Sequence, residues 1–221
     1  MNGKIKNKSA YLFDMDGTLV DTEPIGPEVF EALFESNGAK LSNDEKELFV
    51  KVWRRDGTDI KEDVYLENLR QKYAIGVAPA QFLQTFFDNY KKAIIVANPL
   101  DNANEFIRKA HAANIKLAVA TSSKREQAMA ILDFHGWTGL FNTVVAEEDI
   151  THFKPDPEPY LVAAQKLSVI PEECVVFEDA KNGAIAGKAA GMFVVGLRAG
   201  NEIEQDLSVA DVVVQSFTEL L

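Results

Sequence analysis

The chain has 221 residues, of which 47% are hydrophobic, and it carries a net charge of −11 with an isoelectric point near 4.8. Its length suits one large domain or a core with a smaller module, and its hydrophobic content argues against disorder. The acidity argues against a basic face for nucleic acid and against binding to an anionic membrane surface. The single cysteine, Cys174, excludes an internal disulfide and is expected to be a small buried apolar residue.

The first residues are polar and lack the apolar region of a signal peptide, and no stretch approaches the length of a membrane span. We therefore expect a cytoplasmic protein without nucleic-acid or membrane partners. We also expect a monomer or a weak homodimer.

The first predicted strand, Ala10–Phe13, leads directly into an acidic turn that contains Asp14, Asp16 and Gly17. Side chains two residues apart in an extended chain point to the same side, so both carboxylates are expected to face one small volume. Two like charges held this close are costly unless one keeps its proton or a cation lies between them. The spacing alone leaves an ordinary Asp-Gly turn open as the alternative. A calcium loop is excluded because its twelfth position, which requires Glu, is Ile25.

The next segment reads almost wholly as helix. The predicted helices are Pro27–Ser36, Asn43–Trp53, Lys61–Tyr73 and Pro79–Ile95. Such an insertion directly after the first strand suggests a separate module, so we expect an α-helical cap domain at residues 21–96. The core domain would then comprise residues 1–20 and 97–221. Ligands of open α/β sheets bind outside the carboxyl ends of the strands, where a helical module would cover the site.

Two arginines, Arg54 and Arg55, lie at a predicted helix end within this module, beside a glycine turn. They are candidates for gripping an anionic substrate tail. The alternative is a solvated helix C-terminus, where arginine is favoured by the helix dipole.

Strands and helices alternate from residue 100 to the end of the chain. Short apolar runs predict strands at Lys116–Ala120, Thr143–Ala146, Val175–Phe177, Phe193–Leu197 and Asp211–Val214. Helical patterns lie between them at Asn102–Asn114, Lys124–His135, Glu158–Leu167 and Gly183–Ala190. This alternation predicts an α/β fold with a Rossmann-like, doubly wound, mostly parallel sheet that has helices on both faces.

Polar residues follow the later strands. Thr121 and Ser122 come after the second predicted strand, where hydroxyl and backbone N–H groups at a helix start suit a phosphate. Helix capping is the alternative for these two residues. Lys154 follows the third strand and is either a phosphate anchor or a solvated surface charge. The fourth strand ends in Glu178 and Asp179, and such pairs often cap helices.

The two acidic pairs together predict a cation site. Asp14, Asp16, Glu178 and Asp179 would place four carboxylates in one region, which is strongly unfavourable without a cation. Mg²⁺ is a hard cation that prefers oxygen ligands, so it would relieve this repulsion.

Taken in order, Asp14-Met-Asp16-Gly17-Thr18, Thr121, Lys154 and Glu178-Asp179 resemble the four motifs of the haloacid dehalogenase-like (HAD) phosphohydrolases. The helical insertion resembles the subfamily with a cap between the first two motifs, and the chain is similar to its phosphatase and beta-phosphoglucomutase-like group. The similarity spans nearly the whole chain.

The resemblance implies catalytic roles for both residues of the first acidic pair. Asp14 would be the nucleophile that forms an aspartyl-phosphate, and Asp16 would be the general acid and then the general base. Thr121, Ser122 and Lys154 would bind the phosphoryl oxygens.

The resemblance also implies Mg²⁺ as the cofactor. Asp14, the backbone carbonyl of Asp16 and Asp179 would bind the ion, and Glu178 would support it directly or through water. Phosphoryl transfer depends mainly on positioning and charge neutralisation, which these groups would supply.

We expect a Mg²⁺-dependent phosphatase that acts on a small phosphorylated metabolite, such as a sugar phosphate. The alternative is a phosphosugar mutase, but mutase relatives carry a cap histidine near the position of Gly26, and no histidine lies between Asp16 and His111. Dehalogenases of the superfamily lack the second aspartate, which is present here. A non-catalytic binding or regulatory protein is a further alternative, although a pure binder has no need of Asp16.

Overall fold

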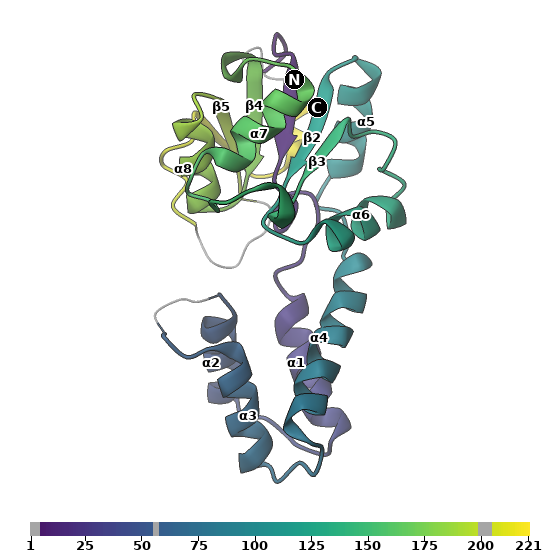
Figure 1. Ribbon diagram of the computed structural model, residues 1–221, viewed down its shortest axis with the longest axis vertical. Helices are drawn as coiled ribbons and strands as arrows, with labels where there is room; N and C mark the ends of the chain where they lie inside the picture. Colours follow the sequence, from purple (N-terminus) through teal and green to yellow (C-terminus); the bar gives the residue numbers. More distant parts are fainter. Residues whose placement is uncertain (1–4, 55–57, 199–204) are drawn as a thin grey trace. The chain divides into compact units, whose positions relative to one another are not determined.

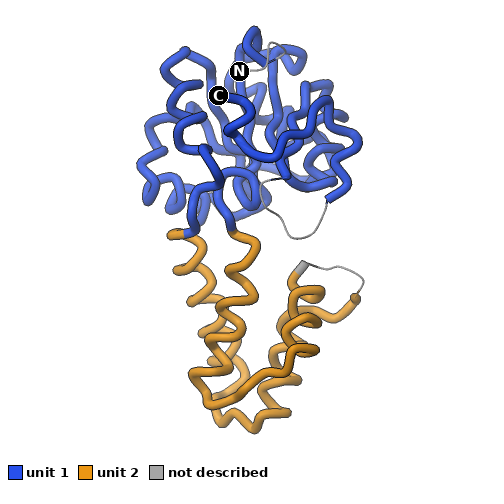
Figure 2. Tube along the Cα trace, turned by 180° about the vertical axis from the view of Figure 1, so that it is seen from behind, with its two compact units in different colours: residues 1–21, 97–221 blue, residues 22–96 orange. Residues whose placement is uncertain are grey.

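The computed structural model describes residues 5–54, 58–198 and 205–221. The chain divides into two compact units, which Figure 2 shows in blue and orange. The first, called here the α/β unit, comprises Met1–Asp21 and Ala97–Leu221, and the second, called the helical unit, comprises Thr22–Val96.

Within the described residues, the α/β unit contains one six-stranded sheet with the order β3-β2-β1-β4-β5-β6 (Figure 1). Every neighbouring pair of strands is parallel. The strands are β1 (Ala10–Phe13), β2 (Lys116–Ala120), β3 (Thr143–Val145), β4 (Cys174–Glu178), β5 (Phe193–Leu197) and β6 (Val212–Val214). This strand order confirms the predicted Rossmann-like α/β fold.

The helices of the α/β unit cover both faces of the sheet. They are α5 (Ala103–Ala112), α6 (Arg125–Phe134), α7 (Glu158–Leu167) and α8 (Lys181–Ala189), with short 3₁₀ turns η1 (Glu147–Asp149), η2 (Pro171–Glu173) and η3 (Phe217–Leu220). In Figure 1, α7 crosses in front of the sheet.

The central strand β1 divides its side chains between these two layers. Ala10 and Leu12 pack into one buried cluster with Tyr160 of α7. Tyr11 points to the opposite face, where its ring stacks on that of Phe106 in α5 at a centroid distance of 5.8 Å. Alternate residues of a strand share a face, so the parity along β1 decides which helices each later side chain meets.

The helical unit has its own aromatic core. Its helices are α1 (Ile25–Ser36), α2 (Asn43–Arg54), α3 (Glu62–Lys72) and α4 (Pro79–Ile95). Phe30 of α1 stacks on Phe49 of α2 with a centroid distance of 3.9 Å, and Phe34 contacts Phe82 of α4 at 5.3 Å. Burial of these large rings accounts for a unit that is separate from the sheet.

A buried carboxylate ties α2 to the end of α3. Glu45 accepts hydrogen bonds from Ser42 N at 2.7 Å, Lys72 Nζ at 2.7 Å and the Tyr73 hydroxyl at 2.6 Å. Ser42 Oγ in turn accepts from Glu45 N, which completes a capping box at the start of α2. Burial would raise the pKa of Glu45, but these hydrogen bonds outweigh it and lower the pKa to about 2.

The chain leaves and re-enters the α/β unit through two paired segments. Val20 and Pro99 form an antiparallel bridge, and Asp21 N donates to Asn98 O at 2.8 Å. The insertion therefore begins and ends at neighbouring points of the α/β unit.

Cys174 is buried, as predicted from the sequence. No helix in the described part of the chain is both long and apolar enough to cross a bilayer.

Candidate active site

The candidate site begins where β1 and β4 end. These strands are neighbours in register, with Phe13 beside Phe177, and Asp14 N donates to Phe177 O at 3.0 Å. The direction of strand order reverses between β1 and β4, so the next residues lie at the point where doubly wound sheets bind ligands. Those residues are Asp14, which follows β1, and Glu178, which is the last residue of β4.

Strand parity brings these two carboxylates to the α7 side of the sheet. Leu12 and Val176 belong to the buried cluster that contacts α7 and α8. Asp14 and Glu178 each lie two residues further along and continue the same face. Both are buried, and both contact Lys154.

Lys154 reaches this edge from the loop that follows β3, and its side chain is only 8% exposed. Its ammonium donates to Asp14 Oδ1 at 2.5 Å, Glu178 Oε1 at 2.7 Å and Ala120 O at 3.0 Å. Burial would lower the pKa of Lys154, but the two carboxylates outweigh it and hold the pKa well above its usual value. The side chain is therefore a cation at neutral pH, in the position predicted for a phosphate anchor.

Asp14 is held in a crowded acidic environment. Burial raises its pKa, and the charges of Glu178, Asp179 and Asp16 raise it further. Lys154 opposes these effects only in part, so the pKa stays well above its ordinary value. A second cation beside Asp14 would favour its charged form.

Three carboxylates form a group suited to that cation. Single oxygen atoms of Asp14, Glu178 and Asp179 all lie within 4.8 Å of one another. Thr18 Oγ1 donates to Asp179 Oδ1 at 2.8 Å and orients this carboxylate. Gly17 has a φ of +77°, and a Cβ there would lie 2.3 Å from Asp179 Oδ2. The turn thus requires glycine at position 17. The oxygen atoms of the three carboxylates are hard donors, which fit Mg²⁺ chemically.

The second aspartate of the first motif has different partners. β1 ends at Phe13, so Asp16 lies beyond the strand, and its carboxylate has partners other than the Lys154 that Asp14 contacts. Asp16 Oδ2 accepts from Ser123 Oγ at 2.8 Å and from Thr121 Oγ1 at 3.4 Å. The hydroxyl groups of Thr121 and Ser123 therefore orient Asp16, the residue expected to act first as general acid and then as general base.

The residues after β2 do not cap α6 with their side chains. The N-cap residue is Lys124, whose side chain makes no capping hydrogen bond, and Arg125 N donates to the Glu148 carboxylate at 3.0 Å. Instead, Ser123 N donates to Thr121 Oγ1 at 3.0 Å, while Ser122 is exposed. Ser123 was not singled out from the sequence, where the only signal was a second serine in the same turn.

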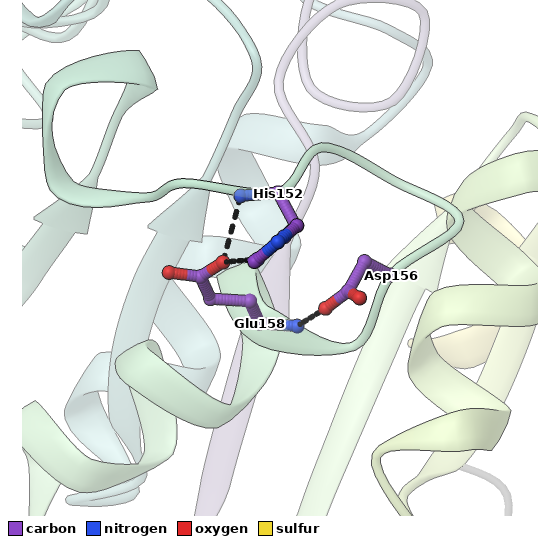
Figure 3. Close-up of side chains that lie close together, drawn as sticks. All are labelled: His152, Asp156 and Glu158. Carbon is purple, nitrogen blue, oxygen red and sulfur yellow. Dashed lines mark hydrogen bonds and ion pairs between the residues drawn. The ribbon is translucent and has the colours of Figure 1, made fainter.

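A second polar group closes the loop that carries Lys154 (Figure 3). Glu158 accepts from Thr151 N at 3.0 Å and from His152 N at 2.7 Å, while Asp156 Oδ1 accepts from Glu158 N at 2.9 Å. The hydrogen bonds, above all that from Thr151 N, lower the pKa of Glu158 to about 2. His152, Asp156 and Glu158 also have ligand-like spacing, but their contacts are explained by loop closure.

The predicted arginine pair receives no structural support or contradiction. Arg54 is the last residue of α2, and Arg55 lies outside the described residues.

The fold and this site define an α/β protein in which a buried lysine and three carboxylates meet at the carboxyl edge of a doubly wound sheet. The sequence model of the haloacid dehalogenase-like hydrolases matches residues 8–191, and the chain belongs to this family.

Two relatives and one solved structure indicate which group within this family the chain resembles. The phosphorylated carbohydrates phosphatase of Thermotoga maritima is 34% identical over 187 residues, which cover 83% of this chain and 82% of that protein. Validoxylamine A 7'-phosphate phosphatase of Streptomyces hygroscopicus subsp. limoneus is 31% identical, with coverages of 95% and 94%. A Thermotoga maritima structure assigned as a beta-phosphoglucomutase superposes with a TM-score of 0.80 at 29% identity, with coverages of 93% and 94%. The chain is therefore an enzyme of the predicted phosphatase and beta-phosphoglucomutase-like group.

Proposed function

We propose that this protein is a Mg²⁺-dependent phosphatase that releases phosphate from a small phosphorylated metabolite, a sugar phosphate or a similar phosphomonoester. The observation that carries the proposal is the buried ammonium of Lys154, which bonds to Asp14. Asp14 in turn belongs to the cluster of three carboxylates with Glu178 and Asp179. The relatives named for phosphorylated carbohydrates and for validoxylamine A 7'-phosphate support a polyhydroxylated substrate.

In the proposed reaction, an oxygen of Asp14 attacks phosphorus while the bond to the leaving oxygen breaks. Asp16 gives its proton to that leaving oxygen, and an aspartyl-phosphate remains on Asp14. Water then attacks phosphorus and gives a proton to Asp16, and the bond to Asp14 breaks to release phosphate. Thr121, Ser122 and Lys154 hold the phosphoryl oxygens throughout.

We propose Asp14, Asp179 and the backbone carbonyl of Asp16 as Mg²⁺ ligands, with Glu178 acting directly or through water. The bound ion supplies charge neutralisation between an anionic nucleophile and an anionic phosphate. The close grouping of the three side-chain carboxylates supports this assignment.

The contact between Gly26 and Trp53 favours hydrolysis over the alternative, a phosphosugar mutase. A Cβ added at Gly26 would lie 2.4 Å from Cε2 of the Trp53 indole. No side chain fits at position 26 while Trp53 keeps this place, and this is near the position where mutase relatives carry histidine. The likeness to a structure assigned as a mutase makes product analysis the deciding test.

We further propose that residues 21–96 act as a substrate-selecting cap, with Arg54 and Arg55 as candidate anion-binding residues. The insertion of the helical unit directly after the first acidic motif supports this role. A cytoplasmic location and a monomer or weak homodimer remain our predictions.

A hydrolysis screen tests the proposed function. The purified protein would be assayed against an aryl phosphate and a panel of phosphorylated metabolites, ranked by kcat/KM. We expect phosphate release that stops on chelation and returns with Mg²⁺. An isomerised sugar phosphate as the main product would favour the mutase, and no turnover of any substrate would favour the binding protein.

A further inference from the structure

Tyr160 is a buried polar residue at the site to which the proposed mechanism gives no role. It lies in the first turn of α7 with 0% of its surface exposed. Its hydroxyl donates to Glu178 Oε1 at 2.7 Å, and its ring centroid lies 4.9 Å from Lys154 Nζ. Phenylalanine would fill the same space, so the hydroxyl group adds the contact to Glu178 specifically.

The Glu178 carboxylate is fixed from several sides. Oε1 accepts from both Tyr160 and Lys154, and Oε2 accepts from Ala180 N at 3.1 Å. Gly183 of α8 lies so close that a Cβ there would be 1.7 Å from Oε1. The carboxylate therefore rests against bare helix backbone, and its orientation is set by the donors around it.

Lys154 has three hydrogen-bond donors, and all three have acceptors in this structure: Asp14, Glu178 and Ala120 O. A phosphoryl oxygen can therefore bind the ammonium only if one acceptor is released. Ala120 O belongs to the backbone of β2 and cannot move away without disturbing the sheet. The choice lies between the two carboxylates.

We propose that Tyr160 is a positioning residue that makes Glu178 the lasting partner of Lys154, so that an incoming phosphoryl group displaces Asp14 from the ammonium. Asp14 is then released from Lys154 at the moment when it is needed to attack phosphorus. This inference rests on the proposed phosphatase function. If Tyr160 only filled the core, loss of its hydroxyl would change stability and leave phosphate binding unchanged.

The variant Tyr160→Phe removes this hydroxyl and keeps the ring. Glu178 is then held less firmly beside Lys154, so the ammonium binds Asp14 more strongly and is less available to an anion. We expect the Kd of inorganic phosphate, measured by calorimetry on the Mg²⁺-loaded protein, to rise roughly tenfold. The kcat/KM for an aryl phosphate should fall by a similar factor.

Tyr11→Phe is the matched control, because Tyr11 is equally buried and its hydroxyl donates to a backbone carbonyl, Ile5 O, at 3.0 Å. We expect its phosphate Kd and kcat/KM to equal those of the wild type. Equal behaviour of both tyrosine variants would overturn the positioning role. Absence of both turnover and phosphate binding in the wild type would instead overturn the proposed function.

A double-mutant cycle with Glu178→Gln separates positioning from a loss of folding. If Tyr160 acts through Glu178, adding Tyr160→Phe to Glu178→Gln should change the phosphate Kd less than twofold. The full roughly tenfold effect in that background would show that the hydroxyl does not act through Glu178, and would refute the proposal.

Discussion

At the scale of single residues, the site places one buried ammonium among competing carboxylates. Lys154 bonds to Asp14 and Glu178, while Asp16 bonds to the hydroxyl groups after β2. Asp14 and Asp16 therefore have different neighbours, and this is the physical basis for giving these two residues different proposed roles. Asp14 has the cation that an attacking carboxylate needs, and Asp16 has neutral partners that suit proton exchange.

Asp14→Asn should abolish turnover, because the amide cannot form the covalent intermediate through a carboxylate oxygen. We expect kcat for an aryl phosphate to fall by roughly 10⁴-fold or more, as for other essential catalytic groups. Asp133→Asn, on the exposed surface of α6, is the control and should retain full activity. Substantial Mg²⁺-dependent turnover by Asp14→Asn would rule out Asp14 as the nucleophile.

Ser123→Ala should impair proton transfer, because Asp16 loses the 2.8 Å hydrogen bond that orients its carboxylate. A hydrogen bond to a charged group contributes about 1.5–3 kcal/mol, so we expect kcat to fall about tenfold or more with little change in KM. Ser9→Ala is matched, since Ser9 also donates to a carboxylate, Glu173 Oε2, but lies before β1. An unchanged kcat for Ser123→Ala would show that Asp16 needs no such support.

At the scale of elements, the start of α7 supports the site from two directions. The Tyr160 hydroxyl donates to Glu178, and Glu158 accepts hydrogen bonds that close the loop carrying Lys154. Pro157 occupies the N-cap position of α7, and Asp156 Oδ1 accepts from Glu158 N, the first residue of the helix. One helical turn therefore sets the positions of two charged side chains.

Glu158→Gln should loosen that loop, because an amide nitrogen replaces one of the oxygens that accept from the Thr151 and His152 backbone. We expect kcat/KM to fall about tenfold through poorer placement of Lys154. Glu172→Gln, at an exposed position of η2, should match the wild type. If both variants have wild-type kcat/KM, loop closure does not position the lysine.

Most elements could be predicted because their patterns are local. The strands Ala10–Phe13, Lys116–Ala120 and Phe193–Leu197 were predicted with the bounds that the structure has. The first helix was expected to begin at Pro27 but begins at Ile25. Proline is tolerated there because first-turn N–H groups have no intrahelical acceptor, so it does not mark the boundary sharply.

The contacts of the site were less predictable than its composition. The motifs indicated which residues follow each strand, and strand order brings Asp14, Lys154 and Glu178 to one edge. No motif in the sequence marks Tyr160 or Ser123 as a candidate site residue. Their bonds depend on side-chain orientation across 18 and 107 residues of chain, which no local pattern encodes.

At the scale of the whole molecule, each unit contains carboxylates whose pKa values are lower in the folded protein than in the unfolded chain. Glu45 and Glu67 lie in the helical unit, and Glu158 and Asp206 in the α/β unit, all with pKa values of about 2. For Glu45, burial opposes this shift and hydrogen bonds from Lys72, Tyr73 and Ser42 outweigh it. Acid should therefore weaken both units.

A folded pKa below the unfolded one gives stability that is present above the unfolded value, near pH 4.5, and is lost as pH falls toward 2. We expect these carboxylates to make the urea midpoint drop between pH 4.5 and 2. Glu45→Gln should lower the midpoint at pH 7 and flatten the drop, whereas Glu47→Gln, exposed on the same helix, should do neither. A midpoint independent of pH in this window would contradict the assignment.

The paired segments at Val20 and Pro99 make the insertion exchangeable. Antiparallel neighbours have Cα atoms only about 5 Å apart, the separation that a short hairpin turn spans. Any segment whose ends meet at that distance can be grafted there while the sheet keeps its strand order. Under the proposed role of residues 21–96 as a substrate-selecting cap, exchange of this insertion would change specificity without repacking the core of the α/β unit.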